Sequence, residues 1–428
     1  MSNQNLELAL DTLRTKFGLN QFREKQVEVI ERLLSGRNVL ALLPTGYGKS
    51  ICYQVPSQIL PGVTLVVSPL IALMQDQLAG LARRGIYNAT VLNSTLDYQE
   101  MSERIAGIKS GEYKLVYVAP ERFESPRFRE LLRGINVSLM VIDEAHCISQ
   151  WGHDFRPQYR NLGTAVHELF GKETVVLALT ATATPTVKRD IVKNLALPEM
   201  DIVEGSFDRP NLAFVVQPFT SAKLKDQFLY ESLRTIQGAT IVYASSRNET
   251  ERLGRLLKAA GFRAYFYHAG LDNSMRTKVQ KAFETDRLQI IVSTVAFGMG
   301  VDKPNIRQVI HYNLPGAVEG YYHEAGRVGR DGDPALCTLM YQPKDIYVQK
   351  WLLDKKDITD ELKRIDKQRL DSMVRYAQSY ACRRTQLLAY FGQTPAKCGH
   401  CDVCEPLVAR NLANSMAGQN GQLALPIH

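Results

Sequence analysis

The chain has 428 residues, 45% of them hydrophobic and 22% charged, and this length predicts two or three globular domains. Lys and Arg outnumber Asp and Glu by 52 to 44, and the net charge of +8 suits a polyanionic partner, although many proteins of this size reach it without binding nucleic acid. The N-terminal segment lacks the apolar core of a signal peptide, and no run approaches the roughly 18 apolar residues of a membrane span. Secreted and membrane-spanning classes are therefore disfavoured, and the seven cysteines are expected to be reduced, so that a cysteine cluster indicates metal binding.

The first part of the chain alternates short apolar runs with helical patterns, for example at 75–84 and 97–110. The runs, which we predict to be buried parallel strands, are VLALL (39–43), TLVVSP (64–69), ATVLNS (89–94), LVYVAP (115–120), SLMVID (138–143) and VVLALTAT (175–182). Strand and helix alternation of this kind predicts an α/β domain with a doubly wound parallel sheet, which we assign to residues 1–207.

After a break near GSFDRPN (205–211) the pattern begins again over residues 208–342, with helices predicted at 247–260 and 274–284. The strands predicted for this second α/β domain are ATIVYAS (239–245), RAYFYHA (263–269), LQIIVST (288–294), VIHYN (309–313) and ALCTLMY (335–341). Residues 343–408 become polar and helical and carry a cysteine cluster, and residues 409–428 have the composition of a flexible tail.

The motif PTGYGKS (44–50) joins the first predicted strand to an apolar helix. Backbone N–H groups of such a turn can surround a β-phosphate, Lys49 would neutralise phosphate charge, and the Ser50 hydroxyl would ligate Mg²⁺. Position 43 is Leu, so the longer GxxxxGKS pattern is not met, and a glycine-rich turn without a ligand is the alternative. The predicted nucleotide-binding residues of this loop are Thr45, Gly46, Gly48, Lys49 and Ser50.

The tetrapeptide DEAH (143–146) ends another predicted strand of the same domain. A carboxylate at the carboxyl edge of a parallel sheet is suited to anchor magnesium, so we assign this role to Asp143. Glu144 would polarise the attacking water as a general base. Acidic residues often end strands, and the assignment depends on the phosphate loop that precedes this motif.

These motifs, in this order and spacing, resemble those of RecQ-family DNA helicases within helicase superfamily 2, over about residues 10 to 405. The matching segments are LPTGYGKS, SPLIALMQDQ, VIDEAHCISQWGHDFRPQY, ALTATAT, STVAFGMGVDKPNIRQVIHY and EAGRVGRDG. The resemblance implies two tandem RecA-like domains that close on ATP and Mg²⁺ at their interface while single-stranded DNA crosses both, followed by a helical zinc-binding subdomain.

The segment FGLNQFREKQ (17–26) resembles the adenine-recognition motif of that family, which implies that Arg23 and Gln26 contact the base. The family usually has an aromatic residue where this chain has Leu19, so weaker stacking on adenine is expected. An amphipathic helix with an exposed Gln is the alternative.

The loop after DEAH resembles the aromatic-rich loop of the family. Exposed rings beside an arginine can stack on unpaired bases without reading sequence, and the loop follows Glu144 closely enough to report DNA occupancy to the hydrolytic site. Without the resemblance, packing of these rings in the core is the favoured interpretation. The predicted DNA-binding residues are Trp151, His153, Phe155 and Arg156.

Further contacts are implied for the first domain by the same resemblance. Backbone contacts to single-stranded DNA are expected from Ser68, Pro69, Gln75, Gln77 and Asn93–Thr95, and a link from the nucleotide to those contacts from Thr180, Thr182 and Thr184. Hydroxyls that merely cap strands are the alternative for both sets.

The segment HEAGRVGRDG (323–332) carries two arginines of the second domain. A planar guanidinium suits the charge that spreads over a γ-phosphoryl group, so Arg330 is predicted to be the arginine finger and Arg327 its neighbour on the phosphates. His323 stands where the family usually has Gln, which makes its charge depend on pH, and Val328 replaces a small Ala. Asp302 is implied to contact ribose or to relay between sites.

Four cysteines near the end of the chain have the spacing C-x15-C-x2-C-x2-C. Four thiolates with no open position predict a structural, tetrahedral Zn²⁺ site formed by Cys382, Cys398, Cys401 and Cys404, with His400 as a competing ligand. Cys52, Cys147 and Cys337 lie in apolar context and are predicted to be buried thiols.

The predicted function is that of an ATP-dependent 3′→5′ DNA helicase and translocase in DNA repair or recombination, acting as a monomer on single-stranded and forked DNA. Its expected cofactors are ATP, Mg²⁺ and a structural Zn²⁺, and its expected location is the cytoplasm, at the nucleoid if the source is bacterial.

Only 24 residues follow Cys404, too few for the winged-helix and HRDC domains of many RecQ proteins, so a naturally short form and a truncated form both stay open. An RNA helicase is one rival, which the aromatic-rich loop and the four cysteines disfavour. An ATP-dependent DNA-binding or remodelling factor with little unwinding activity is the other.

Overall fold

The computed structural model describes residues 2–93, 96–152, 154–171, 173–197, 199–235, 238–297, 303–394 and 396–405. The chain forms two compact units, Met1–Phe207 and a second that begins at Asp208. Among the described residues, no helix has both the length and the apolar character that a bilayer crossing requires.

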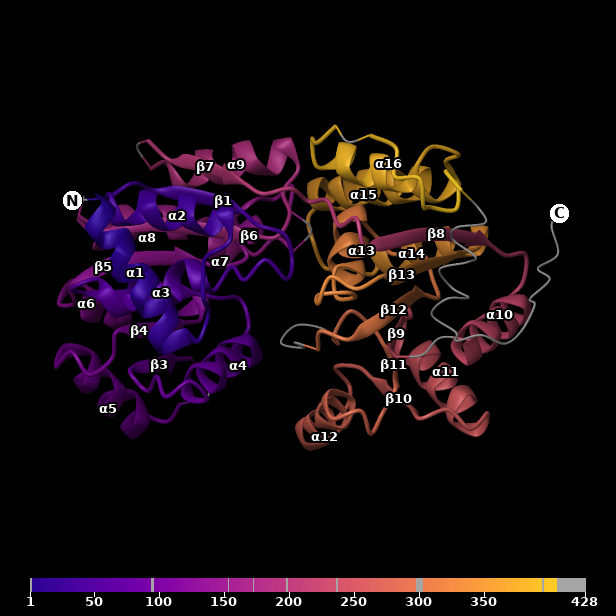
Figure 1. Cartoon of the computed structure of the whole chain (residues 1–428), viewed down its shortest axis with the longest axis horizontal. Coiled ribbons are helices and arrows are strands. Elements are labelled where there is room, and N and C mark those ends of the chain that lie inside the picture. The colour runs from indigo at the N-terminus through magenta and orange to yellow at the C-terminus, as the bar shows by residue number, and fades with distance from the viewer. Residues whose placement is uncertain are drawn as a thin grey trace. The chain divides into compact units, whose positions relative to one another are not determined.

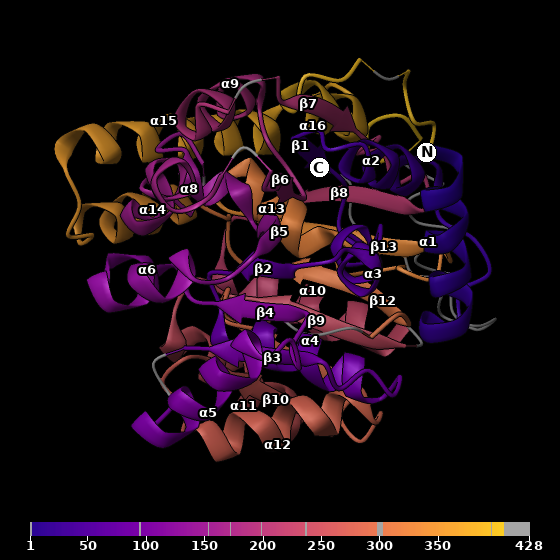
Figure 2. The same ribbon diagram turned by 90° about the vertical axis from the view of Figure 1, so that its left-hand side faces the viewer.

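The first unit is built on a seven-stranded sheet in which every neighbouring pair of strands is parallel. The strands are β1 (Val39–Leu42), β2 (Val63–Val67), β3 (Ala89–Leu92), β4 (Leu115–Val118), β5 (Val137–Ile142), β6 (Val175–Thr180) and β7 (Asp201–Glu204), in the order β3-β4-β2-β5-β6-β1-β7. In Figure 2 these strands run from β7 at the top to β3 at the bottom. All residues of β1, β2 and β4 are buried, as expected for a sheet covered on both faces.

Two groups of helices cover this sheet. The helices α1, α2 and α3 pack on one another, and α8 packs on both α6 and α9. Right-handed crossovers between parallel strands place such groups on opposite faces. The elements are α1 (Ser2–Phe17), α2 (Glu24–Leu34), α3 (Ile51–Ile59), α4 (Ile71–Ala82), α5 (Tyr98–Lys109), α6 (Pro126–Arg133), α7 (Pro157–Arg160), α8 (Leu162–Leu169) and α9 (Pro185–Leu195), with 3-10 turns η1 (Pro120–Glu124) and η2 (Ala145–Ile148).

The second unit contains a six-stranded parallel sheet in the order β10-β11-β9-β12-β13-β8. Its strands are β8 (Leu212–Pro218), β9 (Ala239–Tyr243), β10 (Ala264–Tyr267), β11 (Ile290–Ser293), β12 (Ile306–His311) and β13 (Ala335–Tyr341). Its helices are α10 (Ala222–Thr235), α11 (Arg247–Ala259), α12 (Asn273–Glu284), α13 (Val318–Ala325), α14 (Pro343–Asp354), α15 (Asp360–Gln378) and α16 (Arg383–Tyr390).

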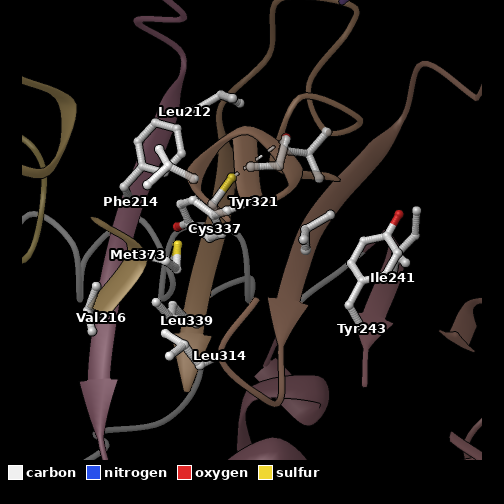
Figure 3. Packing of buried hydrophobic residues seen from close by; sticks show 14 of the residues in the cluster. Leu212, Phe214, Val216, Ile241, Tyr243, Leu314, Tyr321, Cys337, Leu339 and Met373 are labelled. Atoms are coloured by element: carbon white, nitrogen blue, oxygen red, sulfur yellow. Dashed lines mark hydrogen bonds between the residues drawn. The ribbon is translucent and has the colours of Figure 1, made fainter. Parts of the chain in front are cut away.

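The last two helices share a hydrophobic core with this second sheet. Met373 of α15 and Leu387 of α16 belong to the same buried cluster as Phe214 of β8 and Cys337 of β13. Figure 3 shows Phe214, Met373 and Cys337 gathered between β8 and β13, and Figure 1 shows α15 and α16 next to α13 and β8. The helical segment after β13 is therefore packed into the second unit.

The predicted fold class is confirmed: two tandem parallel-sheet α/β domains are followed by a helical segment that carries the cysteines. Every apolar run predicted to be a strand forms one, and the predicted helices correspond to α4, α5, α11 and α12. Two strands were not anticipated, β7 and β8, and both stand at an edge of their sheet.

Candidate functional site

The phosphate loop leaves the carboxyl end of β1 and enters α3. Gly46 and Gly48 have φ of +83° and +80°, a left-handed conformation that side chains disfavour, so glycine is needed at both positions. The amino group of Lys49 lies 3.5 Å from the carbonyl oxygen of Leu43, and the Ser50 side chain makes no capping bond to α3. The Ser50 hydroxyl is thus available to ligate a metal.

Arg23 and Gln26 hold this loop from the start of α2. The Gln26 amide donates to the carbonyl oxygens of Tyr47 and Gly48 at 2.9 and 3.0 Å and accepts from the Arg23 backbone N–H at 2.8 Å. The Arg23 guanidinium donates to the Gly46 carbonyl at 2.6 Å and lies over the Tyr47 ring. The two residues predicted to contact adenine therefore contact the phosphate loop in this structure, while Leu19 is 42% exposed.

Asp143 and Glu144 follow β5, two strands from β1 in the sheet. Glu144 has a φ of +50°, which is unusual for a residue with a side chain, and its backbone N–H donates to the Asp143 carboxylate at 3.0 Å. Burial and the neighbouring Glu144 charge raise the pKa of Asp143 to about 7, against the opposing effect of Lys49. A half-buried carboxylate whose charged form is disfavoured in this way is stabilised by a bound cation, so the donor set of Asp143 and Ser50 fits Mg²⁺.

A hydrogen-bonded connection joins the DEAH motif to the end of β6. His146 is buried, and its Nδ1 lies 3.3 Å from the Glu144 carboxylate and 3.0 Å from the Thr180 hydroxyl. Thr180 in turn donates to the carbonyl oxygen of Thr182 at 3.1 Å. Thr184 instead caps α9, because its hydroxyl accepts from the Val187 N–H.

The described part of the aromatic-rich loop presents one exposed ring. Trp151 is 36% exposed, whereas Phe155 is half-buried. Arg156 donates to the Pro69 carbonyl at 3.0 Å and pairs with Asp154 at 3.1 Å, so it joins this loop to the segment that follows β2. His153 lies outside the described residues.

The remaining residues expected to contact DNA lie at the same sheet edge or on α4. The Ser68 hydroxyl is buried and makes no hydrogen bond, Gln75 is exposed, and Gln77 accepts a hydrogen bond from Gln54 at 2.8 Å. Asn93 is buried, and its carbonyl accepts from Arg122. The other two residues of that segment, Ser94 and Thr95, lie outside the described residues.

In the second unit, Arg327 and Arg330 stand on a turn between α13 and β13. Val328 is fully buried in the core cluster, which fixes the middle of this turn. Gly329 has a φ of +56° and hydrogen-bonds to the Ile306 carbonyl at 3.0 Å. Asp302 lies outside the described residues.

Sequence reasoning missed the residues that hold this turn. Arg209, Asn211 and Arg307 all donate hydrogen bonds to it, the first two mainly to backbone carbonyls. The only available signal was the polar composition of the FDRPN segment, which was interpreted as a break between domains.

The four predicted zinc ligands come together. The Sγ atoms of Cys382, Cys398, Cys401 and Cys404 all lie within 4.8 Å of one another. Tetrahedral Zn²⁺ with Zn–S bonds of about 2.3 Å requires S–S distances of roughly 3.8 Å, so the geometry fits the metal.

The four thiols differ in acidity. Burial opposes the charged form of the Cys382 thiol, but hydrogen bonds from Thr385 and from the Cys398 N–H outweigh it and lower its pKa to about 6. Burial raises the pKa of Cys398 to about 12 and also raises the pKa of Cys404, so a bound cation would be needed to stabilise these two thiolates. His400 does not compete for the metal position in the structure, because its Nδ1 lies 2.7 Å from the Cys398 carbonyl and its Nε2 3.3 Å from that of Leu212. Cys52, Cys147 and Cys337 are buried thiols, as predicted.

Two parallel-sheet α/β units, the first with a phosphate loop and a DEAH motif at one sheet edge, define a helicase core of the RecA-like type. Family models match it in three places: DEAD/DEAH box helicase over residues 23–190, helicase conserved C-terminal domain over 223–332, and RecQ zinc-binding over 343–405. The chain is 45% identical over 402 residues to the ATP-dependent DNA helicase RecQ of Bacillus subtilis, covering 93% of this chain and 67% of that protein. It therefore belongs to the RecQ family of ATP-dependent DNA helicases, with ATP and Mg²⁺ as cofactors and a zinc-binding domain.

Other relatives agree with this assignment. The ATP-dependent DNA helicase RecQ of Pasteurella multocida is 42% identical over 93% of this chain and 62% of its own length. The chain thus spans about two thirds of these curated relatives. The solved structure of S. cerevisiae Dbp5 bound to RNA and ADP BeF3 matches with a TM-score of 0.63 over 86% of this chain and 99% of that one, and at 18% identity this likeness shows the shared fold.

Proposed function

We propose that this chain hydrolyses ATP to move in the 3′→5′ direction along single-stranded DNA and to separate duplex strands. The observation that carries the proposal is the meeting of the phosphate loop, the DEAH motif and the Thr180 strand end at one edge of the first sheet, on the adjacent strands β1, β6 and β5. In parallel sheets this edge is where ligands bind. The RecQ name of the bacterial relatives supports DNA as the substrate and unwinding as the outcome.

In this proposal the loop N–H groups and Lys49 bind the phosphates, and Ser50 and Asp143 hold the metal. Bound Mg²⁺ supplies charge that stabilises the phosphoryl group in transfer. Glu144 orients and deprotonates the attacking water, and its position beside His146 is supported by the 3.3 Å contact between the two side chains. Arg330 acts as the arginine finger and Arg327 assists it.

For adenine recognition, we propose that Arg23 and Gln26 serve two states. In one state, which the structure shows, their side chains hold the loop carbonyls through hydrogen bonds such as those of Gln26 to Tyr47 and Gly48. On ATP binding the Gln26 amide exchanges these partners for the base. The loop carbonyls and the adenine base would compete for the same Gln26 amide. This competition explains how Gln26 can be buried in the structure and still take part in nucleotide binding.

Coupling to DNA is proposed to run through the aromatic-rich loop. Trp151 and Phe155, with His153, stack on unpaired bases, and Arg156 transmits their position to Pro69 through its 3.0 Å hydrogen bond. The connection from Glu144 through His146 to Thr180 supplies a second link at the catalytic end.

The finer features of the substrate belong to the same proposal. Forked DNA is the proposed substrate for unwinding, and the working unit is a monomer placed at the bacterial nucleoid. Support for the bacterial setting comes from the named relatives of Bacillus subtilis and Pasteurella multocida.

The deciding experiment pairs two assays on one preparation. ATP hydrolysis is measured with and without single-stranded DNA, and strand displacement is measured on matched duplexes with 3′ or 5′ single-stranded tails. We expect hydrolysis to be stimulated by DNA and displacement to need a 3′ tail. Stimulated hydrolysis with no displacement on any duplex would instead favour an ATP-dependent remodelling factor, and stimulation by RNA alone would favour an RNA helicase.

A further inference from the structure

The turn that carries Arg327 and Arg330 is gripped by two side chains from the segment before β8. The Arg209 guanidinium donates to the carbonyl oxygens of Gly326, Val328 and Gly329 at 3.3, 2.9 and 2.8 Å. The Asn211 amide donates to the carbonyl oxygens of Gly329 and Asp333 at 2.9 Å each. Five hydrogen bonds from two side chains thus fix the path of the backbone on both sides of Arg330.

The atoms around Gly329 are packed so closely that no side chain could be added there. A Cβ added at this glycine would lie 2.5 Å from the Asn211 Nδ2 and 2.8 Å from the Asp333 carbonyl oxygen. The turn is also held by Arg307 of β12, which pairs with the carboxylate of Asp331 and with that of Asp333 at 3.3 Å. The hydrogen bond from Arg307 lowers the pKa of Asp331, which favours the charged form of this carboxylate.

The same segment is tied to the zinc-binding part of the unit. Asp208, next to Arg209, forms a two-pronged ion pair with Arg384 of α16. The neighbouring Arg383 pairs with Asp402 at 3.0 Å, and the carboxylate of Asp402 also accepts from the Val216 N–H of β8. Because α16 begins directly after Cys382, and Asp402 follows Cys401, both anchors belong to the segments that carry the zinc ligands.

We propose that Arg209 is a positioning residue for ATP hydrolysis, holding the turn so that Arg330 is presented in one conformation, and that the Asp208–Arg384 pair makes this position depend on the zinc-binding segment. This inference rests on the proposed role of Arg330 as the arginine finger. An arginine finger stabilises the negative charge that develops on the phosphoryl group in the transition state. Its guanidinium has to be in the correct position before the reaction begins, since a misplacement of about 1 Å costs about a hundredfold in rate. Arginine is suited to the task because its planar fork can bind several carbonyls at once, which a lysine ammonium does not reproduce.

The test compares Arg209→Lys with Arg330→Ala and with the double variant. DNA-stimulated ATP hydrolysis is measured over a range of ATP concentrations at saturating single-stranded DNA, so that kcat and KM are separated. We expect Arg330→Ala to lower kcat about a thousandfold and Arg209→Lys to lower it roughly 10- to 100-fold, with KM for ATP within about twofold of the wild type. In the double variant the further loss caused by Arg209→Lys should be clearly smaller than its loss in the presence of Arg330, because Arg327 is then the remaining arginine that the turn positions.

The matched control is Arg255→Lys, an arginine of α11 in the same unit whose side chain is 70% exposed and pairs with Glu251. It should leave kcat unchanged. Melting temperature and zinc content are measured for every variant, and Asn211→Ala, which removes two of the five hydrogen bonds, replaces Arg209→Lys if that variant fails to fold. A kcat-specific loss in Asn211→Ala would then support the proposal.

The outcomes separate the two levels of inference. Wild-type kcat in both Arg209→Lys and Asn211→Ala, or a loss that multiplies fully with that of Arg330→Ala, overturns the positioning role while leaving the arginine finger intact. Wild-type kcat in Arg330→Ala overturns the finger assignment of the proposed function itself. To test the link to the zinc-binding segment, Arg384→Gln removes the ion pair with Asp208. We expect this variant to have a lower kcat and to retain one zinc per chain. An unchanged kcat would show that the position of the turn does not depend on the zinc-binding segment.

Discussion

At the residue scale, Glu144 combines a strained backbone with its proposed role as the general base. Its left-handed φ of +50° places the carboxylate beside His146, where burial of the imidazole and the Thr180 hydroxyl restrict both side chains. Such strain persists only where the surrounding structure holds it, and here β5, η2 and the Asp143 carboxylate do so. The residue is thus constrained before substrate arrives.

Glu144→Gln should keep ATP binding and lose most DNA-stimulated hydrolysis, because the amide preserves the shape of the side chain but cannot take a proton. Steady-state hydrolysis and equilibrium binding of a fluorescent ATP analogue are the two measurements. Lys49→Ala serves as the contrasting variant, since it should weaken the binding of ATP as well. Hydrolysis by Glu144→Gln at the wild-type rate would mean that another group is the base.

Trp151 is the exposed ring in the described part of the aromatic-rich loop, and its removal should uncouple DNA from hydrolysis. Stacking on a base contributes about 1–3 kcal/mol, so Trp151→Ala should retain basal hydrolysis and lose most of the stimulation by DNA. The chain contains two tryptophans, and Trp351, which is 60% exposed on α14, provides the matched control Trp351→Ala. Normal stimulation of hydrolysis by DNA in Trp151→Ala would show that this ring has a packing role and does not couple DNA binding to hydrolysis.

At the scale of elements, a buried ion pair joins α10 to the start of α14. Lys225 is 1% exposed, and its ammonium lies 2.8 Å from the Asp345 carboxylate and 2.7 Å from the Tyr312 carbonyl oxygen. Asp345 accepts further hydrogen bonds from Asn313 and from the Gln342 N–H. Burial lowers the pKa of Lys225, an effect that Asp345 opposes, so each charge depends on the other.

Lys225→Met should therefore reduce the free energy of unfolding by about 3–5 kcal/mol, because it leaves the Asp345 carboxylate buried without its cation. Lys356→Met, which breaks the 2.6 Å pair with Asp366 made by a half-exposed lysine, should cost less than about 1 kcal/mol. Urea unfolding of the full chain, followed by circular dichroism, compares the two. Equal losses would show that burial does not distinguish these pairs.

At the scale of the whole molecule, the zinc-binding segment is a structural part of the second unit. Its helices α15 and α16 contribute Leu370, Met373 and Leu387 to the core that β8 and β13 also form. Asp402, between the cysteine ligands, holds the edge strand β8 through the Val216 N–H. Loss of metal should consequently loosen the second sheet as well as the chain end.

Purified protein should contain one Zn²⁺ per chain, and Cys398→Ser should lower its yield and melting temperature, since structural zinc contributes on the order of 10 kcal/mol to folding in small sites. Elemental analysis and thermal unfolding are the measurements, and Cys337→Ser, a buried thiol outside the cluster, controls for loss of a cysteine alone. Zinc-free protein that melts like the wild type would rule out a structural role.

The sequence alone was sufficient for the parts of this protein that depend on local pattern. Buried strands are continuous apolar runs, a phosphate loop needs glycine at fixed positions, and four cysteines at short spacing have few arrangements around one metal. The order of these signals was also enough to indicate the family. The edge strand β8 escaped detection, because LAFVVQP follows a polar break and its register is set by pairing with β13.

Only the tertiary structure decided which polar side chains work together. The hydrogen bonds of Gln26 to Tyr47 and of Arg209 to Gly329 join residues 21 and 120 positions apart in the chain. Their acceptors are backbone carbonyls, which every residue type possesses and which therefore leave no trace in the sequence. The buried pair of Lys225 and Asp345 is hidden for a related reason, since the sequence shows two charges but not their burial. Contacts of this kind exist only once the strands are paired, and they hold the segments that carry the residues proposed to be chemically active.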